Sequence, residues 1–116
     1  MRSDALYLRD IVDAADAIGR FLIDAPEERF LLNELQQSAI LQKLIVIGEA
    51  AARISSDIRT AYPHVPWQDI VAFRNIAVHA YFSVDWTIVW NAATVDVPDL
   101  KMQIEAILHS ESDNNE

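Results

Sequence analysis

The chain has 116 residues, of which 52% are hydrophobic and 23% are charged, with two glycines and four prolines. This composition excludes a disordered or collagen-like chain and argues against a turn-rich all-β protein, and the lack of cysteine excludes disulfides, thiolate metal sites and thiol catalysis. Nine basic against eighteen acidic residues give a net charge of −9, so any contact with nucleic acid must rest on a few placed residues rather than on a basic surface.

The sequence suggests neither a targeting signal nor a membrane segment. The first four residues become acidic at once and lack an apolar signal core. The most apolar stretch, residues 40–54, includes Lys43, Glu49 and Arg53, and is too short and too charged to span a bilayer. We therefore expect a cytoplasmic protein that makes no contact with a membrane.

The first quarter of the chain predicts one long helix and one short one. Ser3 or Asp4 can cap the long helix, and apolar residues recur at steps of three and four from Leu8 to Leu22, which is the pattern of one helical face. The sequence Asp24-Ala25-Pro26 ends this helix. Residues 27–33 are expected to form a short helical piece.

The middle of the chain predicts two longer helices. The first runs from about residue 33 to 55, is apolar most of the way round, and should be the most buried. Within it, Gly48 and the alanines around it form a flat surface on which another helix can approach closely. Two prolines in the segment 62–66 break the chain, and Pro66 can start a helix over residues 67–81.

The last third predicts two further helices. Ser83 or Asp85 caps a short one. Residues 95–98, Val-Asp-Val-Pro, are expected to break the chain again, and a final helix runs from about residue 98 to 108.

These elements predict one all-α domain over residues 1–109, followed by an acidic, disordered tail at 110–116. No internal repeat or linker is visible in the sequence. Four or five helices joined by short connections are most simply arranged as an antiparallel up-and-down bundle.

No common motif for phosphate or metal binding is present. There is no Gly-rich phosphate loop and no His-Glu-x-x-His, and the three histidines lie 15 and 30 residues apart. We therefore predict neither a metal site nor a cofactor. Trp67, Trp86 and Trp90 have the chemistry to stack on bases, but aromatic residues at helical spacing are more often core, and we favour that interpretation.

Polar side chains interrupt the apolar pattern of residues 74–81, and these are Arg74, Asn75, His79 and Tyr81. Arg74 lies in phase with the apolar stripe, and unpaired polar groups buried there would cost a monomer a few kcal/mol each. A symmetric dimer with a water-containing cleft would avoid this cost. In one ideal helix Arg74 and His79 lie roughly 140° apart, so they converge only if the helix ends near His79 or across a two-fold axis.

A purely structural interpretation of the same residues also exists. A histidine near a helix end commonly interacts with the helix dipole, and an arginine commonly forms a salt bridge, for which Glu49 is a candidate partner. On composition alone this structural interpretation is favoured.

The order of the residues resembles the HEPN superfamily and, within it, the HepT toxins, whose mark is Arg-x-x-x-x-His-x-Tyr. Arg74, His79 and Tyr81 stand in that register. The flanks are similar too, at Ile-Gly-Glu-Ala-Ala in 47–51, Pro-Trp before Arg-Asn in 66–75, and the residues after Tyr81 up to Trp90. The likeness spans about residues 8–100, and its one small departure is Phe73, where methionine is expected.

The resemblance implies a metal-independent endoribonuclease that forms a homodimer. Arg74 and His79 would be catalytic, Tyr81 would accept AMP, and Asn75 would either orient His79 or the phosphate, or hydrogen-bond at the dimer seam. The implied partner is a minimal nucleotidyltransferase antitoxin, MntA-like, in a type VII-like toxin–antitoxin pair, with which the dimer could form a larger complex. The sequence leaves open whether tRNA or mRNA is the target. The alternative function is a non-catalytic HEPN binding module that partners a nucleotidyltransferase.

Overall fold

The computed structural model describes residues 3–76 and 85–114, and within these ranges the chain forms helices and no strand. The elements are α1 (Asp4–Phe21), α2 (Glu27–Phe30), α3 (Glu34–Ala52), α4 (Ser56–Ala61), α5 (Trp67–Val71), α7 (Trp86–Asn91), the π-helix η1 (Ala92–Asp96) and α8 (Val97–Asn114). The all-α prediction is therefore confirmed. In the described part of the chain, no helix combines the length and apolar character needed to cross a bilayer.

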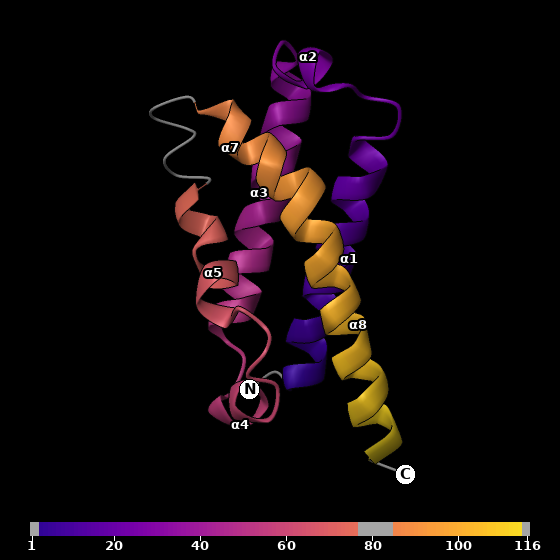
Figure 1. Ribbon diagram of the computed structural model, residues 1–116, viewed down its shortest axis with the longest axis vertical. Helices are drawn as coiled ribbons and strands as arrows, with labels where there is room; N and C mark the ends of the chain where they lie inside the picture. The colour runs from indigo at the N-terminus through magenta and orange to yellow at the C-terminus, as the bar shows by residue number, and fades with distance from the viewer. Residues whose placement is uncertain (1–2, 77–84, 115–116) are drawn as a thin grey trace.

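The three long helices lie along the long axis of the molecule, and α1 packs against both α3 and α8 (Figure 1). Figure 1 shows α1 rising from the end where the N-terminus lies, α3 returning to it, and α8 ending there again. The short helices α5 and α7 pack against α3. This is the up-and-down bundle that the sequence predicts, 48 Å long and 27 by 25 Å across.

Helix α1 follows its sequence pattern closely. Ser3 caps it by accepting a hydrogen bond from the Leu6 amide, and the apolar positions from Leu8 to Ile18 are buried. Capping and periodicity are both local signals, which is why the predicted bounds are confirmed to within a residue or two.

Helix α3 ends earlier than predicted, and an unpredicted helix, α4, follows it. Ser55 lies outside α3 and caps α4, accepting a hydrogen bond from the Ile58 amide. The Ser55 amide and hydroxyl in turn donate to the Asp4 carboxylate at 2.9 and 2.5 Å. Arg59 of α4 donates to the carbonyl of Ala51 in the last turn of α3 and to that of Ile54 just after it, so both carbonyls have a side-chain partner.

The predicted break at residues 95–98 is wrong, because the chain stays helical from α7 through η1 into α8. The Val97 amide donates to the Ala92 carbonyl, five residues earlier. This π-type register carries the helix past Pro98, whose missing N–H would interrupt the ordinary bonding pattern.

Helix α8 is also longer than predicted. It continues to Asn114, so residues 110–114 are helical where the sequence suggests a disordered tail. The Tyr62 hydroxyl donates to the Glu111 carboxylate at 2.6 Å, which attaches this last part of α8 to the segment after α4.

Trp67 belongs to the core, as predicted, and Trp86 and Trp90 are partly buried and pack against it. Trp67 is 6% exposed and its indole N–H donates to the Tyr62 carbonyl at 3.0 Å. Trp86 and Trp90 both pack on the ring of the fully buried Phe30, with ring centroids 6.3 and 5.3 Å away. These tryptophans therefore serve packing, which leaves the search for a functional site to polar residues.

Candidate functional site

The segment that carries Arg74 follows α5 and is not one continuous helix with it. The sequence predicts a helix over 67–81, but α5 ends at Val71, the chain turns at Ala72, and residues 73–76 are helical again. After the turn, the Asn75 amide donates to the Ala72 carbonyl, three residues back, at 2.9 Å. The predicted helix is therefore interrupted at Ala72, two residues before Arg74.

Gly48 of α3 allows this segment to lie directly against α3. A Cβ atom built on Gly48 would lie 2.8 Å from the Arg74 amide nitrogen and 3.1 Å from both the Arg74 Cβ and the Val71 carbonyl oxygen. The 2.8 Å distance is shorter than real Cβ contacts and the two 3.1 Å distances are tight, so a larger residue at this position would require the segment to shift. The flat surface predicted at Gly48 is thus the surface on which the backbone of Arg74 rests.

The next residue of α3, Glu49, contacts the other end of Arg74. Arg74 Nη1 donates to Glu49 Oε1 at 3.3 Å, and the two side chains are 41% and 47% exposed. The bond uses one of the five N–H donors of the guanidinium. Arg74 is therefore held by its backbone and by one edge of its guanidinium, while much of the side chain faces solvent.

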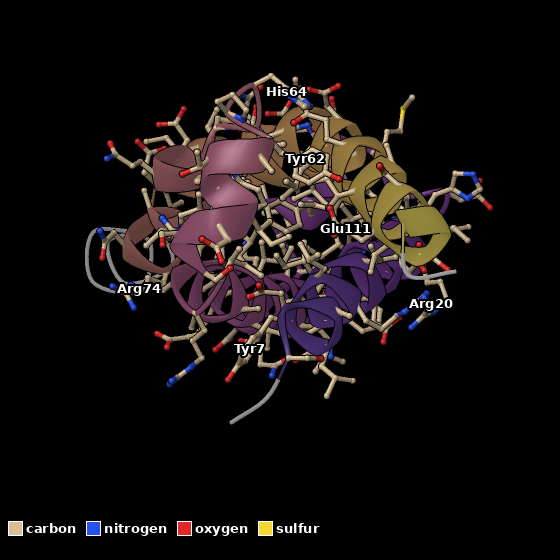
Figure 2. All side chains as sticks on the ribbon, turned by 90° about the horizontal axis from the view of Figure 1, so that it is seen from below. Tyr7, Arg20, Tyr62, His64, Arg74 and Glu111 are labelled. Atoms are coloured by element: carbon tan, nitrogen blue, oxygen red, sulfur yellow. The ribbon has the colours of Figure 1, made fainter. Side chains whose placement is uncertain are left out.

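Arg74 lies at the edge of the bundle and points outward (Figure 2). The expectation that it lies buried in the apolar stripe is wrong, since its side chain is 41% exposed whereas Ile70 is 1% exposed. Asn75 is exposed as well. The argument that buried polar groups require a dimer therefore does not apply to Arg74 and Asn75.

His79 and Tyr81 lie outside the residues that the structure describes. The convergence of Arg74 with His79, and the direction of the Tyr81 hydroxyl, thus stay predictions. The pairing of Arg74 with Glu49, which the sequence could only suggest, is confirmed.

A hollow of about 350 Å³ lies between the segment 66–76 and the start of α8, and Arg74 does not line it. Phe73 and its apolar neighbours form part of the lining, and Asp69, Asp96 and Asp99 supply three carboxylates. Negative charges repel a phosphate backbone, so this hollow is a poor place for nucleic acid. Among the described residues, no cluster of three His, Asp or Glu side chains is arranged to hold a metal ion.

The described residues form a small helical bundle that carries a partly exposed arginine on a tightly packed segment. Residues 11–107 match the family model described as "Ribonuclease HepT-like". The chain belongs to the HepT-like ribonuclease family, as its Arg-x-x-x-x-His-x-Tyr motif predicts.

Relatives in archaea are similar over nearly their whole length. "Putative RNase MJ1380" of Methanocaldococcus jannaschii is 35% identical over 101 residues, which covers 87% of this chain and 93% of the relative. "Putative RNase MJ0125" of the same organism is 37% identical over 102 residues, or 88% of each chain. "Probable ribonuclease HepT" of Thermococcus cleftensis is 35% identical over 106 residues, covering 91% of this chain and 96% of the relative. No solved structure matches the chain significantly.

Proposed function

We propose that this protein is an endoribonuclease in which Arg74 and His79 act on one phosphate of an RNA strand. Family membership supports the reaction class. The main support for the proposal is the way Arg74 is held. Its backbone packs against Gly48 while its side chain is 41% exposed. A cation held in this way is available to a phosphate that arrives from solvent.

The proposed reaction needs a group that moves protons and a group that stabilises charge. His79 takes the proton from the ribose 2′-OH, the 2′-oxygen attacks the adjacent phosphorus, and a protonated group returns a proton to the leaving 5′-oxygen. Arg74 stabilises the negative charge that builds up on the phosphate oxygens. The products are a 2′,3′-cyclic phosphate and a 5′-hydroxyl. Side chains supply both functions, so the proposed mechanism is metal-independent.

A homodimer is part of the proposal. With a net charge of −9 the protein repels RNA over most of its surface, and a cleft shared by two copies would gather two arginines at one place. The dimer would also allow Arg74 of one copy to act beside His79 of the other. Sedimentation at micromolar concentration should give twice the mass of the 13.1 kDa chain, and a monomer would contradict this part of the proposal.

Replacing either proposed catalytic residue tests the reaction. Arg74→Ala and His79→Ala should each lower the rate of RNA cleavage about 10²–10⁴-fold, with helical content unchanged by circular dichroism. Arg20→Ala is a matched control, because Arg20 is an exposed arginine that lies at the opposite edge of the bundle in Figure 2. It should cleave RNA at the wild-type rate.

Three outcomes would contradict the reaction as proposed. Wild-type cleavage by a folded Arg74→Ala or His79→Ala variant would remove that residue from the mechanism. Strong inhibition by EDTA would indicate a metal-dependent nuclease. A wild-type protein that cleaves no RNA but binds a nucleotidyltransferase would be a binding module instead.

We further propose that the ribonuclease is the toxin of a toxin–antitoxin pair and that Tyr81 is its control point. A minimal nucleotidyltransferase antitoxin would transfer AMP from ATP to the Tyr81 hydroxyl, releasing pyrophosphate. The added phosphate would compete with RNA for Arg74, and the adenosine would block access. The support is the motif, in which Tyr81 follows His79 by two residues.

Intact-mass spectrometry after co-expression with the nucleotidyltransferase tests this control. Wild-type protein should gain the mass of one or more AMP units and lose activity. Tyr81→Phe should gain none and stay toxic. Neutralisation of Tyr81→Phe without any mass gain would show that the antitoxin acts by occlusion.

A further inference from the structure

We infer that Glu49 is a positioning residue for Arg74, holding one edge of the guanidinium so that its other N–H donors face the RNA phosphate. This inference rests on the proposed function of Arg74. Its starting point is the bond from Arg74 Nη1 to Glu49 Oε1 at 3.3 Å, which joins residues 25 positions apart in the sequence.

The bond is placed where it contributes little to folding. Both side chains are more than 40% exposed, and water and salt screen an ion pair in such a position. A long arginine side chain in solvent samples many rotamers, and ordering it for each reaction is unfavourable in entropy. A carboxylate that selects one orientation in advance removes part of that penalty from the chemical step.

The two residues that hold Arg74 are neighbours in one turn of α3. Gly48 receives the backbone of Arg74, and Glu49 receives its guanidinium. Helix α3 is a firm support, because its neighbouring residues Ile47, Ala50 and Ala51 are at most 5% exposed. The direction of the guanidinium is therefore set relative to the core of the bundle rather than by the local segment alone.

The charge of Glu49 has an effect opposite to that of its orienting bond. A carboxylate beside the site repels the RNA backbone, so its removal should not weaken RNA binding. Loss of orientation, by contrast, lowers the rate of the chemical step. The inference thus predicts a lower kcat together with a KM that is unchanged or lower.

Steady-state cleavage of a short fluorogenic RNA by three variants tests this role. Glu49→Ala should lower kcat about tenfold, because the arginine must then be ordered during each turnover. Glu49→Gln keeps an acceptor oxygen at the same reach and should retain most of the wild-type kcat. Asp16→Ala is the control, since Asp16 forms an ion pair of similar exposure with Lys101, at 2.6 Å, and should leave both constants unchanged.

The outcomes separate this inference from the proposed function. Wild-type kcat for Glu49→Ala would overturn the positioning role, and so would a fall of the same size in Asp16→Ala or a rise in KM with kcat unchanged. Melting temperatures of all three variants should stay within a few degrees of wild type, so that a fall in kcat is not a loss of folded protein. Wild-type cleavage by Arg74→Ala would instead overturn the proposed function.

Discussion

Replacing Gly48 with alanine would add one methyl group where the Arg74 segment lies against α3. The new Cβ would lie 2.8 Å from the Arg74 amide nitrogen and 3.1 Å from the Val71 carbonyl oxygen. Both are backbone atoms, so no side-chain rotation relieves the contact. Reaching the 3.4 Å at which ordinary contacts begin requires the Arg74 amide nitrogen to move by about 0.6 Å.

Two opposing terms set the effect on stability. Alanine is favoured over glycine inside a helix by about 0.5–1 kcal/mol, whereas overpacking a close contact costs about 1–3 kcal/mol. We expect the second term to win, leaving Gly48→Ala about 1 kcal/mol less stable, which lowers the melting temperature by about 4 °C in a chain of this size. Displacing Arg74 should also lower RNA cleavage about tenfold, since misplacement by 1 Å can cost about 10²-fold.

Gly19 supplies a matched control in α1. A Cβ built on Gly19 meets nothing within 4 Å, so only the helix-propensity term applies. Gly19→Ala should raise the melting temperature by about 2–4 °C and leave cleavage unchanged. Thermal unfolding followed by circular dichroism, together with the cleavage assay, measures both effects in the same samples.

The opposite signs of the two glycine substitutions make the reasoning refutable. A Gly48→Ala protein that melts at or above the wild-type temperature would show that the segment moves away from α3 without penalty. A less stable Gly48→Ala protein that cleaves RNA at the wild-type rate per folded molecule would show that the position of Arg74 is not critical to the reaction.

Three further substitutions test the packing that supports this site. The hydrogen bond to Glu111 raises the pKa of Tyr62 above its usual value of 10.0. This bond therefore stabilises the fold below about pH 10 and is lost as the pH rises through the folded-state pKa. The difference in melting temperature between wild type and Tyr62→Phe should be present at pH 8 and vanish in strong alkali. Phe30→Ala should lower the free energy of unfolding by about 3–5 kcal/mol in urea titrations, because Phe30 is fully buried, and a change below 1 kcal/mol would contradict its place in the core. Asp4→Ala removes both bonds to Ser55 and should cost about 1–2 kcal/mol, measured in the same way; an unchanged midpoint would mean that the corner between α3 and α4 forms without them.

Most helices could be predicted because their signals are local. In α1, capping by Ser3 and the spacing of apolar residues lie within the segment itself. The end of α3 could not be located because the apolar pattern continues to Ile54, and the contact of Ser55 with Asp4, 51 residues away, is not visible in the local sequence. The helix through Pro98 was also unpredictable, because a proline is a local break signal and only the π-type register of η1 overrides it.

For the candidate site, the sequence indicates which residues to consider but not how they are arranged in space. The motif identifies Arg74, and the glycine among small residues of α3 indicates a close approach at Gly48. That these two residues meet depends on how α3 packs against the segment after α5, and no local pattern specifies it. The exposure of the Arg74 side chain could not be predicted either, because the apolar spacing of the sequence places Arg74 in the buried stripe.

The ends of α1 and α8 lie at one pole of the bundle (Figure 1), whereas Arg74 lies on its side (Figure 2). An affinity tag, a fluorophore or a fused second domain attached at either terminus would therefore project from that pole and leave the arginine open. The same geometry suits a tandem fusion, in which a linker joins the end of α8 in one copy to the start of α1 in the next. Attachment to a sensor surface through the end of either helix should accordingly leave Arg74 accessible to solvent.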